Sequence, residues 1–373
     1  MSKLAILAIA GLPLVALAQP AYAQNAGDKI AGSYICVFKK GSVSRGSAQA
    51  EANRSVQAAG AQLKHVYTTA LQGFAANMSE QGLANMRANN PNIEYCEQDQ
   101  VVTTGPIQAA APPSGGGTVQ PAQETPWGIA RVNGGAAGTF ATAWIIDTGI
   151  DFSHPDLRAD QARSRNFVER ETSPQDLNGH GTHVSGTIAA LDNGIGVIGV
   201  APGATVVAVR VLNKRGSGTN SGVIAGVDYV AQNGRAGDVA NMSLGGGIST
   251  ALDTAVLNAS AGGVRFALAA GNETDDANNH SPGRVNGPNI YTISAFSVGD
   301  KWASFSNYGN PPVDFAEPGV SVKSTWINGG YNTISGTSMA TPHMAGLLLA
   351  GAVRSGGTVI GDPAGPADTI GVH

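Results

Sequence analysis

Gly336-Thr337-Ser338-Met339-Ala340-Thr341-Pro342-His343-Met344-Ala345-Gly346 combines a turn of small residues with the start of an apolar helix that continues through Leu349. A serine at such a turn lies near unpaired backbone N–H groups, at the positive end of the helix dipole. A developing oxyanion needs that environment. Because a serine hydroxyl is a weak nucleophile, a catalytic Ser338 also requires a histidine base and an orienting aspartate. Taken alone, the stretch fits a helix N-cap followed by a core helix better than a nucleophile.

A candidate base and a candidate acid occur upstream, in two further motifs. Asn178-Gly-His180-Gly is a glycine-rich turn that leads into an apolar run, and Ala143-Trp-Ile-Ile-Asp147 is an apolar strand that ends in a carboxylate. An aspartate at the carboxyl end of a buried parallel strand faces the crevice where α/β sheets bind ligands. Each motif alone fits a turn aspartate or a capping histidine about equally well. The three together, in the order Asp147, His180, Ser338, are far more specific.

These three motifs resemble the catalytic signatures of the subtilisin-like serine proteases, especially the subtilisin and proteinase K branches, and the order of the three residues is the subtilisin order. The resemblance extends over residues 127–351. It implies that Ser338 is the nucleophile, His180 the general base and Asp147 the orienting acid. His183 and His343 are expected to be structural. The Gly-x-Ser-x-Gly elbow of the α/β-hydrolases is absent, because Ala340 occupies its last position.

The same resemblance implies further site residues. Asn272, in Ala269-Ala270-Gly271-Asn272-Glu273, matches the asparagine whose side chain helps to bind the oxyanion; a turn asparagine is the alternative. The segments expected to flank a peptide substrate by strand addition, and the walls of an apolar pocket for the residue before the cleaved bond, are Gly216, Ser217, Gly218, Ser243, Leu244, Gly245, Ala269, Ala270 and Gly271. His280 is expected near the pocket floor. We expect a preference for apolar or aromatic residues in this pocket.

Calcium is the expected ion, and its role would be structural. The loop from Leu191 to Val197 resembles the subtilisin loop that surrounds a calcium, and carbonyls with a carboxylate suit a hard cation. Its ligands by resemblance are Gln123, Asp156, Leu191, Asn193, Ile195 and Val197, and a second candidate site would use Pro288, Ile290 and Asp314. A plain surface loop is the alternative. No His/Cys pattern indicates a transition metal.

The chain ahead of the catalytic motifs divides into three parts. Residues 1–23 fit a secretory signal peptide with an Ala21-Tyr22-Ala23 cleavage motif; a membrane anchor is the alternative. Residues 24–104 predict the order β-α-β-β-α-β of a ferredoxin-like domain, with strands at 33–38, 63–67, 73–77 and 93–97. This unit resembles the inhibitory propeptide of the same family, and an independent binding module is the alternative. Residues 105–121 are rich in Pro, Ala and Gly and predict a linker with a processing site.

Both cysteines, Cys36 and Cys96, fall on the first and last predicted strands of the propeptide domain. These strands are neighbours in a ferredoxin-like sheet, and an exported protein permits oxidation. A cross-strand disulfide and two separate buried thiols are equally consistent with the sequence.

Residues 122–373 predict an α/β catalytic domain with a parallel sheet covered by helices on both faces, because continuous apolar strands alternate with helical stretches. The expected strands are 143–146, 205–211, 239–242, 264–269 and 290–295. The expected helices are 183–191, 221–232 and 249–261.

The sequence therefore predicts a secreted, monomeric serine endopeptidase, made as an autoprocessed zymogen. Its partners would be protein or peptide substrates and its own propeptide as an intramolecular inhibitor. A formal charge of −4, with only 13% charged residues, gives no reason for attraction to nucleic acids or membranes. A silent peptide-binding relative and a lipase or esterase are the alternatives. Labelling by a serine-directed phosphonate, together with cleavage of peptides and esters, would distinguish the three.

Overall fold

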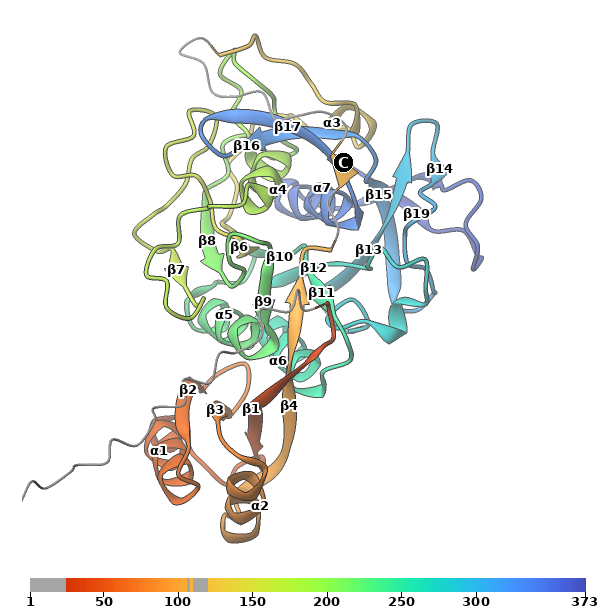
Figure 1. Cartoon of the computed structure of the whole chain (residues 1–373). Coiled ribbons are helices and arrows are strands. Elements are labelled where there is room, and N and C mark those ends of the chain that lie inside the picture. The colour runs from red at the N-terminus through yellow and green to blue at the C-terminus, as the bar shows by residue number, and fades with distance from the viewer. Residues whose placement is uncertain (1–24, 106–107, 110–119) are drawn as a thin grey trace, which may run out of the picture.

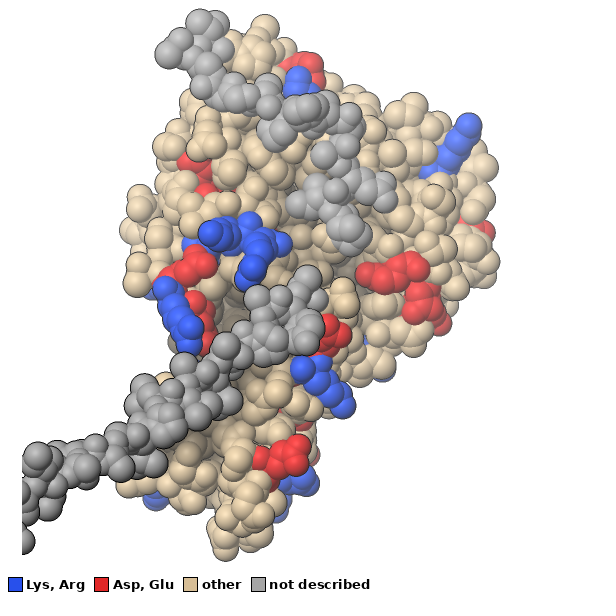
Figure 2. Space-filling view, in the orientation of Figure 1, with Lys and Arg blue, Asp and Glu red and all other residues tan. Residues whose placement is uncertain are grey.

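The computed structural model describes residues 25–105, 108–109 and 120–373. The predicted signal peptide, 1–23, lies outside the described residues, as does most of the predicted linker, 105–121. The described chain forms a small N-terminal domain that packs against a larger α/β domain (Figure 1). On the face drawn in Figure 2, acidic and basic side chains are intermixed and most of the surface is uncharged.

The N-terminal domain has the predicted β-α-β-β-α-β order. Its sheet has the strand order β4-β1-β3-β2, and its helices bury Val56 and Met86 against Phe38 and Phe74 of the strands. Ser79 caps the second helix by accepting a hydrogen bond from the Gly82 N–H at 3.1 Å. The elements are β1 (Lys29–Phe38), a 3-10 turn η1 (Arg45–Ser47), α1 (Ala48–Ala58), β2 (Gln62–Tyr67), β3 (Gly73–Asn77), α2 (Glu80–Asn89) and β4 (Ile93–Thr103).

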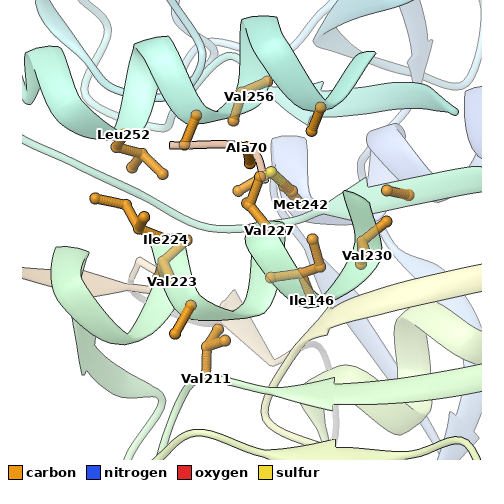
Figure 3. Close-up of a cluster of buried hydrophobic side chains, with 14 of the residues drawn as sticks. Ala70, Ile146, Val211, Val223, Ile224, Val227, Val230, Met242, Leu252 and Val256 are labelled. Carbon is orange, nitrogen blue, oxygen red and sulfur yellow. The ribbon is translucent and has the colours of Figure 1, made fainter. Parts of the chain in front are cut away.

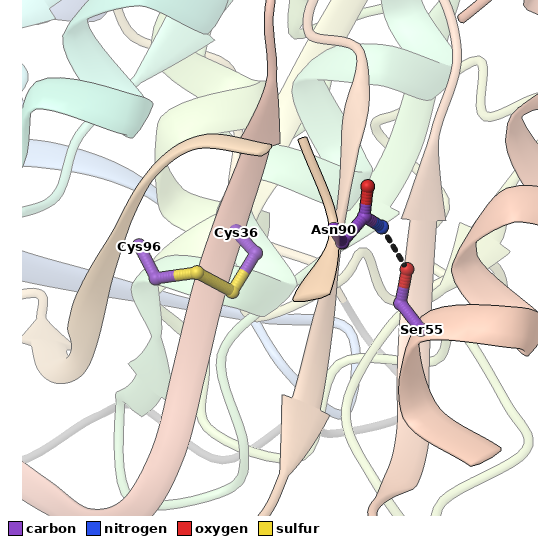
Figure 4. Close-up of a disulfide and its surroundings, with 4 residues drawn as sticks. All are labelled: Cys36, Ser55, Asn90 and Cys96. Carbon is purple, nitrogen blue, oxygen red and sulfur yellow. Dashed lines mark hydrogen bonds between the residues drawn. A yellow bond between two sulfur atoms is a disulfide. The ribbon is translucent and has the colours of Figure 1, made fainter. Parts of the chain in front are cut away.

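A disulfide joins Cys36 on β1 to Cys96 on β4, which settles the question that the sequence left open (Figure 4). The two residues lie directly opposite each other in the antiparallel pair, with Cα atoms 4.1 Å apart. Figure 4 also shows Asn90, just after α2, donating a hydrogen bond to the Ser55 hydroxyl of α1 at 2.8 Å.

Strand β4 is longer than the predicted strand 93–97, because its end pairs with the larger domain. Residues 101–103 run antiparallel to β9 (Ser217–Thr219), and residues 102–103 also pair with β11 (Gly245–Gly246). The end of the small domain is thus a middle strand between two segments of the large one.

The large domain is built on one sheet with the strand order β18-β19-β15-β13-β12-β10-β6-β8-β7. All neighbouring pairs from β19 to β7 are parallel, as predicted, while β18 and β14 add antiparallel edges. The strands are β6 (Ala143–Asp147), β7 (Arg165–Asn166), β8 (Val206–Arg210), β10 (Val239–Met242), β12 (Arg265–Ala269), β13 (Ile290–Ser297), β14 (Lys301–Trp302), β15 (Val313–Pro318), β18 (Arg354–Thr358) and β19 (Thr369–Val372).

Helices cover both faces of this sheet, because successive strand residues point to opposite sides. Helices α4 (His180–Ala189) and α7 (Thr337–Ala350) share a core cluster with Ile145. Helices α5 (Asn220–Asn233) and α6 (Thr250–Ser260) share one with Ile146 and Met242 (Figure 3). Smaller elements are α3 (Trp127–Arg131), a 3-10 turn η2 (Ala277–Asn279), and a three-stranded sheet of β16 (Val322–Trp326), β17 (Gly330–Ser335) and β5 (Gln108–Ala109).

Candidate active site

The predicted acid and base are paired in the structure. Asp147 ends β6, an interior strand between β10 and β8, and His180 is the first residue of α4. The Nδ1 atom of His180 lies 2.9 Å and 3.0 Å from the two carboxylate oxygens of Asp147. Both side chains are almost completely buried. If Nδ1 carries the proton that Asp147 accepts, the lone pair of Nε2 is free to accept a proton from a nucleophile.

Ser338 is the second residue of α7, so it lies at the helix end where backbone N–H groups are unpaired. Among the described residues, its hydroxyl has two acceptors: the carbonyl of Ser243 at 3.1 Å and that of Thr104 at 3.5 Å. Ser243 in turn donates its hydroxyl to the Ser338 carbonyl at 2.8 Å. The last residues of the N-terminal domain therefore reach the predicted nucleophile.

The carboxamide of Asn272, just after β12, has a fixed orientation. Its Oδ1 accepts hydrogen bonds from the Thr337 N–H at 2.8 Å and the Thr337 hydroxyl at 3.0 Å. The Nδ2 group of Asn272 faces Gly105, at the end of the N-terminal domain. A methyl group added to Gly105 would lie 3.2 Å from this nitrogen. Asn272 is thus oriented as a donor next to the Thr104–Gly105 peptide. The sequence did not predict this role of Thr337, although a hydroxyl residue directly before Ser338 could have indicated it.

The two predicted substrate-flanking segments hold the end of β4 between them. Gly218 and Ser217 pair with Val102 and Thr103, the Gly216 carbonyl accepts from the Thr104 N–H at 3.0 Å, and Gly245 pairs with Thr103. The pocket beyond this strand is lined by Thr103, Thr104, Gly105, Leu244, Gly245, Ala269, Ala270, Gly271 and Asn272.

His280 also lines this pocket, where the sequence placed it. Its Nε2 lies 3.1 Å from an Asp275 oxygen and its Nδ1 lies 3.8 Å from a Glu273 oxygen. The pocket therefore combines small apolar groups, such as Ala269 and Ala270, with polar side chains that include Glu273 and His280.

Two other histidines near the motifs are enclosed by protein. His183 donates from Nε2 to the Val322 carbonyl at 3.0 Å, and burial lowers its pKa to about 3. His343 lies 2.9 Å from the Met339 carbonyl, and burial lowers its pKa to about 4. Both rings are neutral at ordinary pH and have no access to substrate, as structural histidines would.

The residues of the first predicted calcium site do come together, and one oxygen is suited to a cation. Asp156 Oδ2 accepts from the Val197 N–H at 3.1 Å and the Tyr331 hydroxyl at 3.2 Å. Its Oδ1 is buried and has no hydrogen-bond donor among the described residues. Burial raises the pKa of this carboxyl to about 6. A buried anionic oxygen without a donor fits an oxygen-seeking cation.

The neutral side chains of that site are already engaged. Gln123 Oε1 accepts from the N–H groups of Asn193 and Gly194 at 2.9 Å and 2.8 Å, and Asn193 Oδ1 accepts from the Ile195 N–H at 3.1 Å. The Leu191, Ile195 and Val197 carbonyls lie in the same loop. In the described residues, no group of three His, Cys, Asp or Glu side chains could hold a metal, so a cation here would depend on carbonyls.

The second predicted site contains one carboxylate, Asp314 on β15. It accepts from the Thr292 N–H at 2.9 Å, and burial raises its pKa to about 6. Ile290, the first residue of β13, and Pro288 just before it belong to the neighbouring segment of the sheet.

Comparisons with known proteins agree with this geometry. The profile described as the Subtilase family matches residues 143–351, and the profile described as Peptidase inhibitor I9 matches residues 33–105. The Extracellular serine proteinase of Thermus sp. (strain Rt41A) is 40% identical in an alignment of 357 positions that covers 88% of this chain and 82% of that protein. Proteinase R of Parengyodontium album is 38% identical in an alignment of 337 positions that covers 86% of this chain and 79% of that protein.

Two further comparisons extend this result. The Alkaline serine exoprotease A of Vibrio alginolyticus is 41% identical in an alignment of 338 positions that covers 85% of this chain, and the chain spans 60% of that protein's length. The crystal structure of a cold-adapted subtilisin-like serine proteinase superposes with a TM-score of 0.56 at 41% identity, covering 65% of this chain and 96% of that one. The chain therefore belongs to the subtilase family of serine proteases, and an I9-type inhibitor domain precedes its catalytic domain.

Proposed function

We propose that this subtilase is an endopeptidase made as a zymogen that cleaves itself. Ser338 attacks the carbonyl carbon of the scissile peptide, and His180 takes the hydroxyl proton and passes it to the leaving amine. Asp147 holds the ring and stabilises its cation. The Ser338 N–H and the Asn272 carboxamide bind the oxyanion, and water then hydrolyses the acyl-enzyme.

The observation that carries this proposal is the course of the chain through the site. The N-terminal domain sends β4 between β9 and β11 as a substrate strand would run, and the Thr104 carbonyl lies 3.5 Å from the Ser338 hydroxyl. That oxygen belongs to the Thr104–Gly105 peptide, which also lies beside Asn272. We assign this bond as the one that the enzyme cuts in its own precursor.

The test is Ser338→Ala in a host that lacks other proteases. The variant should fold, because it loses one hydroxyl, but it should accumulate with the N-terminal domain attached and cleave no peptide. The wild-type catalytic domain should begin at Gly105 when its first residues are sequenced. As a matched control, Ser355→Ala on the exposed strand β18 should process normally. Normal processing of Ser338→Ala would contradict self-cleavage, and a different first residue would contradict the assigned bond.

We propose that the protein is secreted, on the basis of the signal-like sequence at 1–23. Two relatives are named as an exoprotease and an extracellular proteinase, which supports this. In the part of the chain that the structure describes, no helix is both long and apolar enough to cross a bilayer.

We further propose that a calcium ion binds between Asp156 and the 191–197 loop and supports the fold. Asp156 would be its charged ligand, and the carbonyls of Leu191, Ile195 and Val197 would be neutral ligands. The side-chain oxygens of Gln123 and Asn193 would complete the shell by exchanging their present N–H donors for the ion. Asp314 with Pro288 and Ile290 is the second candidate. When bound, the ion would supply charge neutralisation and cross-linking, and it would take no part in peptide cleavage.

A further inference from the structure

A buried carboxylate outside the triad binds the segments that carry the acid and the base. Asp176 precedes His180 by four residues, and only 2% of its surface is exposed. Its Oδ1 accepts from the Thr148 hydroxyl at 2.9 Å, the Asn178 N–H at 2.8 Å and the Gly179 N–H at 2.9 Å. Its Oδ2 accepts from the N–H and the hydroxyl of Thr182 at 3.0 Å and 2.6 Å. Five donors thus converge on one side chain.

Thr148 extends this contact to the acid of the triad. It follows Asp147 directly, and its N–H donates to Asp147 Oδ1 at 2.7 Å. Its hydroxyl accepts from the Gly181 N–H at 2.9 Å while it donates to Asp176. One hydroxyl therefore connects the residue after the acid, the residue after the base and the Asp176 carboxylate.

The position of Asp176 also serves the helix that carries the base. His180 begins α4, and the first N–H groups of a helix lack partners within it. Asp176 accepts from the N–H of Thr182 in the first turn and from two N–H groups of the turn just before it. A negative charge at this end of the helix is favourable as well. The rotation and height of α4, and with them the position of the imidazole, depend on this carboxylate.

We propose that Asp176 is a positioning residue for the reaction, and this proposal rests on the function proposed above. It holds the end of β6 and the start of α4 at the spacing that the Asp147–His180 pair requires, and it touches neither substrate nor the reacting atoms. The sequence analysis missed it, although an aspartate shortly before a helix is a capping signal.

A carboxylate is the group that these donors require. Both of its oxygens accept hydrogen bonds, whereas an amide offers one accepting oxygen and one N–H₂ donor. In Asp176→Asn, the N–H₂ group would replace one of the two accepting oxygens. It would then face either the three donors that now bind Oδ1 or the two that now bind Oδ2. The loop and the first turn of α4 would then move apart, and a displacement of about 1 Å can cost about 100-fold in rate.

Asp151 provides a matched control, because it is a second buried aspartate in the same region. Its side chain accepts from the Ser153 N–H and hydroxyl, from Gln175 and from the Gly329 N–H, so its carboxylate contacts neither Thr148 nor α4. Asp151→Asn thus makes the same chemical change but leaves in place the hydrogen bonds of Asp176 that join the segments carrying Asp147 and His180.

The experiment compares Asp176→Asn and Asp151→Asn in mature enzyme. Active sites are counted with a serine-directed phosphonate, so kcat is expressed per labelled site, and KM for a peptide is measured alongside. Variants that no longer process themselves are converted by tagged wild-type enzyme, which is then removed. We expect Asp176→Asn to lose about 100-fold in kcat per site with little change in KM, because the substrate-binding strands are untouched. Asp151→Asn should keep its kcat per site even if its stability falls.

Thr148 keeps the proposal testable if Asp176→Asn does not fold. Thr148→Ser retains the hydroxyl and should keep wild-type kcat, whereas Thr148→Val loses it and should lower kcat with KM unchanged. Wild-type kcat per site in Asp176→Asn or in Thr148→Val would overturn the proposal, and so would an equal loss in Asp151→Asn. If the phosphonate does not label the wild-type enzyme, the proposed function is contradicted. The proposed role of Asp176, which rests on that function, is then contradicted as well.

Discussion

Two buried acids in the large domain have opposite surroundings. Asp147 is fully buried but faces the His180 ring and the Thr148 N–H. Glu317 on β15 is also fully buried, yet neither of its carboxylate oxygens has a hydrogen-bond partner among the described residues. Burial raises the pKa of Glu317 well above its ordinary value, and the positive charge of Arg131 opposes this only in part. This direction of the pKa shift favours the neutral, protonated form of Glu317.

The raised pKa of Glu317 predicts a stability cost that depends on pH. A carboxyl whose pKa is higher in the folded state binds more protons folded than unfolded, so its contribution to stability is lost as the pH rises above about 4.5. Glu317→Gln cannot ionise and should escape this loss. Urea unfolding of phosphonate-inhibited enzyme between pH 5 and 8 should show wild type losing up to about 1.4 kcal/mol per pH unit relative to the variant. Glu169→Gln, at an exposed site, should show the same pH dependence of the unfolding free energy as wild type. The same pH dependence in Glu317→Gln would contradict the raised pKa of Glu317.

At the scale of elements, two helices of the catalytic domain are capped from the inhibitor domain. Asp99 on β4 accepts from the Ser221 N–H at 3.0 Å and the Ser221 hydroxyl at 2.6 Å, near the start of α5. Glu97 on the same strand accepts from the Ser249 hydroxyl and from the Ala251 N–H, near the start of α6. Carboxylates at helix N-termini satisfy unpaired N–H groups and favour the helix dipole.

These caps predict how tightly the inhibitor domain binds. Added in trans, residues 24–104 should inhibit the mature enzyme, with β4 along Gly216–Gly218 and Ser243–Gly245. Asp99→Asn and Glu97→Gln should each weaken inhibition by about 10- to 100-fold, because hydrogen bonds to charged groups contribute about 1.5–3 kcal/mol. Glu94→Gln, at an exposed position of the same strand, is the control. The inhibition constant is measured in a peptide-cleavage assay. Unchanged constants for both interface variants would contradict a contribution of these two caps to binding.

Element boundaries also show where sequence reasoning succeeds and where it stops. The five predicted strands of the large domain all formed, because continuous apolar runs determine buried parallel strands locally. Strand β15 was not among them, since Glu317 and Pro318 interrupt its apolar pattern. The end of β4 was missed because its partners, β9 and β11, lie far away in sequence. Asp176 was missed because its importance lies in five donors that only the fold assembles.

At the scale of the whole molecule, one of the buried clusters is shared by the two domains. Tyr67 and Ala70 of the inhibitor domain belong to the same buried cluster as residues of α5 and α6. Ala70 is drawn with that cluster in Figure 3. The Tyr67 hydroxyl donates to the Ser221 carbonyl at 2.9 Å, and Asp228 of α5 accepts from the Thr69 and Ala70 N–H groups at 2.7 Å. Release of the inhibitor domain, as proposed above, would therefore expose apolar surface, and the mature domain would have to be stable without this support.

Calcium is expected to supply part of that stability. An ion that binds only the folded state adds about 2.7 kcal/mol at a hundredfold excess over its dissociation constant. A chelator should therefore shorten the half-life of mature enzyme at elevated temperature. Asp156→Ala should have the short half-life with or without calcium. Asp160→Ala, which removes a carboxylate paired with Arg163, should respond as wild type. An unchanged wild-type half-life in chelator would count against the ion. A normal calcium response of Asp156→Ala would transfer the role to Asp314.

The Cys36–Cys96 bond has a consequence for where the precursor can be made. It closes a loop across 60 positions, and cross-links of that span are worth about 4 kcal/mol by chain entropy. Both cysteines of the chain lie in the domain that self-cleavage would detach, so the domain after Thr104 contains no thiol. A thiol reductant should then limit how much protease a cell produces and leave finished protease untouched. Redox conditions would therefore affect folding of the precursor, whereas the activity of the mature enzyme would not depend on them.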